Sequence, residues 1–125
     1  MRLIIMRHGE SQNNVLAKIS PEAWRNHRTS EPELSQRGVQ ECQAVGTRLS
    51  EMGIKFDLML TSAHKRAILS LKHVRETYVH SQNIPCQIMT QIHEQWGVNL
   101  GEQTFPGLTR SEVLELLPEL EITEE

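Results

Sequence analysis

Several features that mark specialised classes of protein are scarce in these 125 residues. Small secreted domains held by disulfides carry many cysteines, whereas this chain has two, Cys42 and Cys86, so we expect two buried thiols and no bridge. No apolar run is long enough to cross a membrane, and the apolar stretch 1–6 is too short for the core of a signal peptide. The sequence therefore predicts a cytoplasmic protein without a membrane partner.

An excess of positive charge is also lacking. The chain has 13 Lys and Arg against 16 Asp and Glu, a formal net charge of −3, whereas nucleic-acid binders usually show a basic excess or stripe. We therefore expect no nucleic-acid partner, and an anionic ligand must be held by a local cluster of cations. At 38% hydrophobic and 23% charged residues, the composition is that of an ordinary globular protein. The length suits a single domain over residues 1–125.

Three short apolar runs predict strands. Leu3–Met6 contains adjacent branched residues, as in a strand buried on both faces of a parallel sheet. Further strands are expected at 56–60 and at 86–89. Residues 20–33 are polar, contain two prolines and have no periodicity, so we interpret them as a long loop.

Helices are predicted between and after these strands, from capping residues and from apolar residues spaced three or four apart. They are expected at 11–19, 35–53, 67–78 and 109–117. The last of them begins with a capping-box pair, Thr109 and Glu112, and is stopped by proline. Strands that alternate with helices in this way indicate an α/β domain with a mostly parallel sheet.

The candidate chemistry lies in the five residues that follow the first predicted strand, Arg7-His8-Gly9-Glu10-Ser11. Ligands of open α/β sheets bind beyond the carboxyl ends of strands, where the next helix presents free N–H groups that favour phosphate. The guanidinium of Arg7 can grip phosphate oxygens, and Gly9 lets the backbone approach a ligand closely. An imidazole held there, that of His8, can attack phosphorus and carry the phosphoryl group covalently.

The motif Arg7-His8-Gly9 is too short to decide the function by itself, but further motifs follow it in order. In order along the chain, the motifs are Arg7-His8-Gly9-Glu10-Ser11, Asn14, Leu34-Ser35, Gly38, Gly46, Leu49, and Thr61-Ser62-Ala63-His64-Lys65-Arg66-Ala67. Together these motifs resemble the histidine phosphatase superfamily, also called phosphoglycerate mutase-like, and the resemblance spans nearly the whole chain. It implies a three-layer α/β/α fold with a mostly parallel sheet.

The resemblance also implies roles for individual residues. His8 is expected to be the nucleophile, with Arg7 and Arg66 as a phosphate clamp and Asn14 as an additional hydrogen-bond donor. Arg66 follows the strand predicted at 56–60, so it is expected at the same edge of the sheet as His8. We expect neither a metal nor a cofactor, because the arginines and a helix N-terminus supply the positive charge.

The proton donor of the family is a glutamate after the third strand, ahead of a glycine-rich turn. The segment 92–97 resembles that element, so Glu94 is the candidate and Glu102 is a weaker one. A carboxylic acid that donates a proton to a leaving oxygen needs a raised pKa.

The sequence departs from the family in two places. The second essential histidine, in a His-Gly pair on a late strand, is lacking, so we expect the C-terminal strand or strands of the domain to be missing. The segment between Asn14 and Leu34 lacks the tryptophan–aspartate pattern of glycolytic mutases, which favours a phosphatase. We interpret its cations Arg25, His27 and Arg28 as part of a solvated loop. None of the other histidines is followed by glycine: His27, His64, His73, His80 and His93.

Three functions remain open from the sequence. The first is a phosphomonoester phosphatase that forms a phosphohistidine on His8 and acts on a small phosphorylated substrate. The second is a phosphoglycerate-type mutase, which would return the phosphoryl group to a different oxygen. The third is a non-catalytic phosphate-binding module, which the missing second histidine favours.

Overall fold

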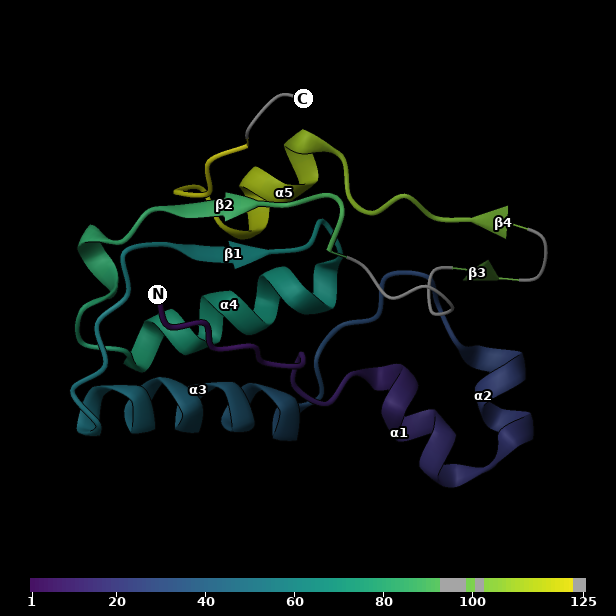
Figure 1. Ribbon diagram of the computed structural model, residues 1–125. Helices are drawn as coiled ribbons and strands as arrows, with labels where there is room; N and C mark the ends of the chain where they lie inside the picture. The colour runs from purple at the N-terminus through teal and green to yellow at the C-terminus, as the bar shows by residue number, and fades with distance from the viewer. Residues whose placement is uncertain (93–98, 101–102, 123–125) are drawn as a thin grey trace.

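The computed structural model describes residues 1–92, 99–100 and 103–122 (Figure 1). Helices dominate, and the strands are short. In chain order, the elements are α1 Gln12–Ile19, α2 Pro21–His27, α3 Gln36–Glu51, β1 Met59–Thr61, α4 Lys65–Thr77, a 3₁₀ turn at Ser81–Asn83, β2 Cys86–Ile88, β3 Asn99–Leu100, β4 Gln103–Thr104 and α5 Arg110–Leu116.

The strands β1 and β2 pair in parallel, with Met59 opposite Cys86. On the other edge of β2, Gln87 and Glu121 form an isolated parallel bridge. The pair β3–β4 is antiparallel and forms a separate two-stranded sheet. The chain is therefore an α/β protein with a parallel sheet, as the sequence predicts, although each strand is shorter than the apolar run that indicated it.

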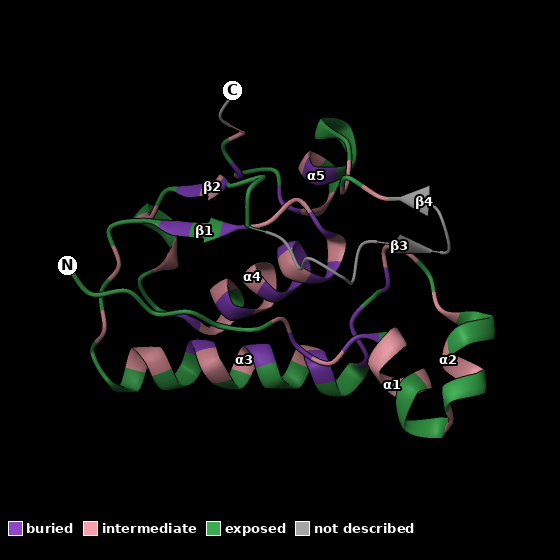
Figure 2. Cartoon of the chain, turned by 45° about the vertical axis from the view of Figure 1, so that its right-hand side comes forward, coloured by how far each residue is buried: buried purple, intermediate pink, exposed green. Residues whose placement is uncertain are grey.

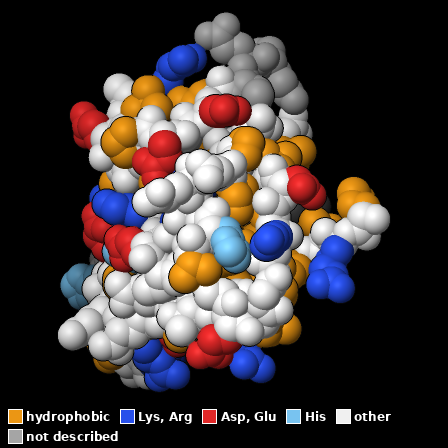
Figure 3. Space-filling model, turned by 90° about the vertical axis from the view of Figure 1, so that its left-hand side faces the viewer, with side chains coloured by type: hydrophobic (Ala, Val, Ile, Leu, Met, Phe, Trp, Pro, Cys, Tyr) orange, Lys and Arg blue, Asp and Glu red, His pale blue; other side chains and the backbone are white. Residues whose placement is uncertain are grey.

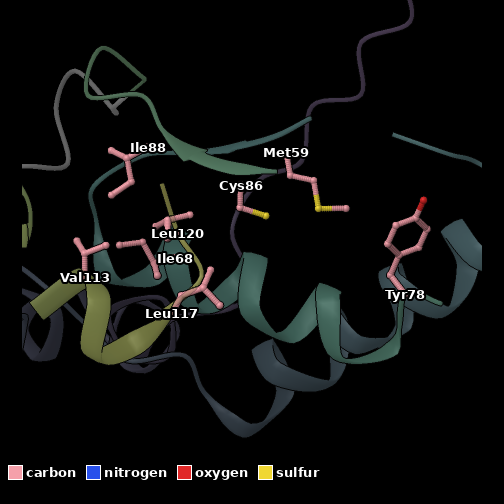
Figure 4. Close-up of a cluster of buried hydrophobic side chains, with 8 residues drawn as sticks. All are labelled: Met59, Ile68, Tyr78, Cys86, Ile88, Val113, Leu117 and Leu120. Atoms are coloured by element: carbon pink, nitrogen blue, oxygen red, sulfur yellow. The ribbon is translucent and has the colours of Figure 1, made fainter. Parts of the chain in front are cut away.

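One face of the β1–β2 sheet carries the core. Alternate residues of the two strands are buried, whereas Leu60, which points to the other face, is 41% exposed. Both α4 and α5 pack against the buried face, and Figure 4 shows their side chains beneath the strands. The cluster comprises Met59, Ile68, Tyr78, Cys86, Ile88, Val113, Leu117 and Leu120.

Helix α3 lies outside α4 and forms the next layer (Figure 1). Its inner face carries Gly38, Cys42 and Gly46, which are spaced four apart and all buried. A Cβ atom on Gly46 would lie 2.2 Å from the carbonyl oxygen of Val74, so the small residue is what lets the two helices approach. In the part of the chain that the structure describes, α4 and α5 pack against the buried face of the sheet, and α3 packs on α4.

The prediction of a strand at Leu3–Met6 is wrong. Residues 1–10 belong to no strand or helix, and the side chain of Ile5 is 85% exposed. Figure 2 shows the segment 1–7 in the colour of exposed residues along its whole length. An apolar run indicates burial but does not supply the neighbouring strand whose ladder would fix it in a sheet. Among the described residues, β1 pairs with β2 and with no other strand, and the run 3–6 lies at the surface.

The long loop expected at 20–33 is also partly wrong, because it contains α2. Ser20 ends α1 and at the same time caps α2: its hydroxyl accepts a hydrogen bond from the N–H of Ala23 at 2.9 Å. Pro21 occupies the first helical position, where proline needs no N–H partner. The Ser-Pro pair, interpreted as a helix breaker, therefore also starts a helix. Together α1 and α2 form a helical hairpin beside the start of α3 (Figure 1).

Helices α1, α3 and α5 begin at the predicted caps: Ser11, Ser35 and Thr109 each accept a backbone hydrogen bond at a helix start. Helix α4 begins at Lys65, two residues before the predicted start, and has no side-chain cap. Cys42 and Cys86 are buried and unbridged, as predicted. Among the described residues, no helix is both long enough and apolar enough to cross a membrane.

Candidate phosphate site

The turn His8–Gly9 is wedged between α3 and α4. A Cβ atom on Gly9 would lie 2.5 Å from the carbonyl oxygen of Gly38 and 2.8 Å from the Sγ atom of Cys42. On the α4 side, the N–H of Gly9 donates a hydrogen bond to Ser70 Oγ at 3.0 Å. Only glycine fits this position without displacing the backbone of α3.

The imidazole of His8 is half-buried, and its Nδ1 atom lies 2.7 Å from the carbonyl oxygen of Gly9. A carbonyl oxygen can only accept, so Nδ1 carries the proton in this contact. In the neutral ring the lone pair then lies on Nε2. The turn therefore favours the tautomer in which Nε2 is the nucleophilic nitrogen.

Arg66 lies in the first turn of α4 and is 7% exposed. Its carbonyl oxygen accepts a hydrogen bond from Ser70 Oγ at 2.7 Å, and the same hydroxyl accepts the N–H of Gly9. The structure therefore links the turn that carries His8 to the helical turn that carries Arg66. The sequence analysis expected His8 and Arg66 to be close because each follows the end of a strand. In the structure they are close because the turn at Gly9 packs on α4, the helix that carries Arg66.

The N–H groups of the turn that leads into α1 already have acceptors within the chain, which limits one part of the sequence interpretation. The helix start was expected to offer its N–H groups to phosphate. All four from residue 9 to residue 12 instead donate to groups of the chain itself, at 2.9–3.0 Å. These four N–H groups are therefore not available to a phosphate in this arrangement. The acceptors are, in order, Ser70 Oγ, Glu41 Oε2, Asn14 Oδ1 and the carbonyl oxygen of Glu33.

Asn14 and Arg7, two further predicted ligands of phosphate, differ in their surroundings. Asn14 Oδ1 accepts from both the N–H and the hydroxyl of Ser11 at 2.9 Å, so it belongs to the capping box of α1. Only the Nδ2 group of Asn14 could donate to a ligand. Arg7 is exposed in the extended segment that precedes His8.

Glu10 adds a carboxylate beside His8. Hydrogen bonds from Lys18 and from Ser35 lower the pKa of Glu10 below its ordinary value, so this carboxylate is ionised at neutral pH. Lys18 also forms an ion pair with it, and Ser35 Oγ donates to its Oε1 atom at 2.8 Å. Glu10 therefore joins the turn to the start of α3, and its ionisation argues against a role as proton donor.

A buried pair that the sequence analysis missed lies two residues before Arg66. Nδ1 of His64 is 2.7 Å from Glu31 Oε1, and the His64 side chain is 4% exposed. The other oxygen of Glu31 accepts the N–H of Lys65 at 2.7 Å, at the first residue of α4. The pair therefore anchors the segment after α2 to the start of the helix that carries Arg66.

The proton-donor candidates Glu94 and Glu102 lie outside the described residues, so this part of the site stays a prediction. Residues 107–108, further along the chain, contact the loop that precedes Arg66. The N–H of Leu108 donates to the carbonyl oxygen of Ala63 at 2.8 Å. Gly107 has a φ of +108°, and a Cβ atom there would lie 2.8 Å from the same oxygen.

Charge is mixed on the surface. On the face drawn in Figure 3, acidic and basic side chains are interspersed, and neither sign forms a continuous field. Within the residues that the structure describes, no group of three or more His, Cys, Asp or Glu side chains is placed to hold a metal ion. The cations that belong to the candidate site itself are Arg7 and Arg66.

Comparison with known proteins decides the family. The model of the histidine phosphatase superfamily (branch 1) matches residues 3–121. The chain belongs to this family. The match spans nearly the whole of this chain, and the motifs with His8, Gly38 and Arg66 lie within it.

This chain is similar to several curated 2,3-bisphosphoglycerate-dependent phosphoglycerate mutases. The protein of Treponema denticola is 39% identical over 74 residues, which are 59% of this chain and 27% of the relative. That of Bartonella tribocorum is 35% identical over 74 residues, or 59% of this chain and 32% of the relative. The matched parts thus make up less than a third of these relatives.

A solved structure is also similar to the chain. It is a protein of Escherichia coli str. K-12 substr. MG1655 that is assigned as an alpha-ribazole-5'-P phosphatase. The two are 27% identical with a TM-score of 0.49, and the match covers 71% of this chain and 38% of that chain.

Proposed function

We propose that this chain carries the phosphate-binding part of a phosphomonoester phosphatase that forms a phosphohistidine on His8. The observation that carries the proposal is the turn at Gly9, which lies against both α3 and α4 and favours the lone pair on Nε2 of His8. A small phosphorylated molecule is the proposed substrate, and neither a nucleic acid nor a membrane is a proposed partner. The family match supports the assignment of His8.

The proposed reaction has two steps. Nε2 of His8 attacks phosphorus, a P–N bond forms, and the P–O bond to the leaving alcohol breaks. The proposed acid Glu94 gives its proton to the leaving oxygen. In the second step, water attacks the phosphorus atom of the phosphohistidine, and Glu94 takes a proton from that water. The P–N bond breaks, inorganic phosphate leaves, and His8 is restored.

The arginines carry the proposed electrostatic part. Charge that develops on the oxygens of the transferring group is stabilised by donors held in place beforehand. Arg66 is nearly buried, so its guanidinium acts where water screens it little, and Arg7 reaches the phosphate from the exposed segment. The Nδ2 group of Asn14 is proposed as a further donor. We propose that this chemistry requires no metal.

A mutase is the second candidate, and the relatives named as phosphoglycerate mutases favour it. It would keep the phosphoryl group on His8 until a second hydroxyl accepts it. A long-lived phosphoenzyme, and transfer to an added alcohol in place of water, would distinguish a mutase from a phosphatase.

The third candidate is a non-catalytic phosphate-binding module. It is favoured by the lack, in this sequence, of a histidine followed by glycine after residue 8. Such a module would bind phosphate or vanadate without turnover.

The experiment that tests the proposal is hydrolysis of p-nitrophenyl phosphate in the presence of EDTA. We expect wild type to be active, His8→Ala to be inactive and His80→Ala, which removes an exposed histidine, to keep full activity. Activity that survives His8→Ala would overturn the proposal. Vanadate binding without turnover by folded wild-type protein would instead support the non-catalytic module.

A further inference from the structure

We infer that Ser70 is a positioning residue that fixes the His8 imidazole relative to Arg66. The inference rests on the proposed function and adds a residue to it. Ser70 lies on α4 one helical turn after Arg66 and is 2% exposed. Its hydroxyl contacts the backbone of Gly9 and of Arg66.

The two hydrogen bonds of Ser70 use its hydroxyl in both directions. Its single proton is donated to the carbonyl oxygen of Arg66 at 2.7 Å, and its oxygen accepts the N–H of Gly9 at 3.0 Å. Both distances lie in the usual range for such bonds. The hydroxyl therefore joins the peptide that follows His8 directly to the first turn of α4.

Close packing restricts Gly9 on the side away from Ser70. On the opposite side, the Cα of Gly9 is held against the carbonyl oxygen of Gly38 and the Sγ atom of Cys42. The carbonyl of Gly9, in turn, holds Nδ1 of His8. The N–H of Gly9 belongs to the peptide between His8 and Gly9, whereas its carbonyl belongs to the next peptide. Ser70 is the polar contact that fixes the first of these two peptides, the one bonded directly to the Cα of His8.

Loss of the hydroxyl would leave the N–H of Gly9 buried without its acceptor. A buried unsatisfied donor is unfavourable, so the peptide would rotate to find another partner. Because that peptide is bonded directly to the Cα of His8, its rotation would also displace the imidazole and its Nε2 atom from the Gly9 carbonyl. Misplacement of a reacting group by about 1 Å can lower a rate by about a hundredfold.

The chain offers a matched control in Ser50. Its hydroxyl donates to the carbonyl oxygen of Gly46 at 2.9 Å and accepts the N–H of Val79 at 3.0 Å, so it makes the same pair of bonds between a helix and a second segment. Ser50 is 12 residues further along α3 than Gly38, which packs against Glu10. At about 1.5 Å per residue, that is about 18 Å along the helix.

The experiment compares wild type, Ser70→Ala, Ser70→Thr and Ser50→Ala. The rate of phosphoenzyme formation is measured in single turnovers with p-nitrophenyl phosphate, together with KM, unfolding by urea and the NMR resonances of the His8 ring. We expect Ser70→Ala to slow phosphorylation by about 10- to 100-fold with a smaller change in KM. Ser70→Thr, which keeps a hydroxyl, should recover most of the rate. Ser50→Ala should lose comparable stability, keep the wild-type rate and leave the His8 resonances in place.

In the rate comparison, either of two results would overturn the inference: a Ser70→Ala rate equal to that of Ser50→Ala, or a Ser70→Thr protein as slow as Ser70→Ala while equally folded. A wild-type protein that forms no phosphoenzyme would contradict the proposed function separately. The His8 resonances then decide the role of Ser70. A shift in Ser70→Ala that is absent in Ser50→Ala supports positioning, and unchanged resonances in both variants refute it.

Discussion

At the scale of single residues, the candidate site depends on the close approach of the Gly9 backbone to α3 and α4 as much as on charged side chains. Gly9 meets Gly38 on one side and Ser70 on the other, while His8 follows the direction of the Gly9 carbonyl. A methyl group at either glycine would push the turn away from α3. The substitution Gly9→Ala therefore tests the packing that places His8.

We expect Gly9→Ala to lower the free energy of unfolding by about 1–3 kcal/mol, as overpacking of a tight contact does, and to abolish phosphoenzyme formation. Urea denaturation and single-turnover assays measure the two effects. Gly53→Ala is the control: its Cβ meets nothing within 4 Å, although its φ of +64° disfavours alanine. That variant should lose stability but keep activity. Full activity in Gly9→Ala would contradict the close packing of the turn.

The residues of the site differ in how far the sequence predicts them. His8 and Arg66 stand in short motifs, so their types and order are visible directly. Ser70 and the pair of His64 with Glu31 are not, because their partners lie 61 and 33 positions away in the chain. Hydrogen bonds over such distances depend on how helices pack, which no local pattern specifies.

At the scale of elements, local chemistry determines most helix starts. Each of three helices begins after a residue whose side-chain oxygen accepts the backbone N–H three positions further on. These capping residues are Ser11, Ser35 and Thr109. The start of α2 was missed because Ser20-Pro21 ends one helix and begins another. Both functions follow from the same proline ring, so the local sequence alone does not distinguish them.

The capping box of α5 predicts a pH dependence. Hydrogen bonds from the hydroxyl and the N–H of Thr109 lower the pKa of Glu112 below its ordinary value of 4.5. A lowered pKa in the folded state means that ionised Glu112 stabilises the fold above pH 4.5. This stabilisation is lost as the pH falls through the lowered pKa. We expect wild type to lose more stability than Glu112→Gln on acidification.

The measurement is the free energy of unfolding from neutral pH down to about pH 3, compared between the two proteins. Glu115→Gln removes an exposed carboxylate from the same helix outside the capping box and serves as the charge-matched control. It should keep the acid dependence of wild type. An identical acid profile for wild type and Glu112→Gln would contradict a stabilising role for the ionised cap.

At the scale of the whole molecule, the alternation of helices with apolar runs predicts a parallel sheet, and β1–β2 confirms it. The position of Leu3–Met6 is the main error, because an apolar run does not specify which strand it pairs with. The burial of Ile68 and Tyr78, by contrast, follows from the packing of α4 against the sheet. The sequence therefore predicts that a run is apolar, whereas the segments that pack against it are known only from the structure.

The different environments of two isoleucines test this architecture. Ile68 is fully buried and Ile5 is 85% exposed. We expect Ile68→Ala to lower the free energy of unfolding by about 2–5 kcal/mol, because it leaves a cavity in the core. The matched change Ile5→Ala should alter it by no more than about 0.5 kcal/mol. Urea denaturation of both variants measures this difference. Equal losses would mean that residues 3–6 pack as a buried strand.

The central claim is that His8 carries the phosphoryl group, and the most direct test is to locate that group after reaction with a phosphomonoester. The reaction is quenched in alkali, and the modified residue is identified by mass spectrometry. We predict a phosphohistidine at His8 that is stable to alkali, labile to acid and absent from His8→Ala. A phosphoryl group on another residue, or one that withstands acid, would contradict the account.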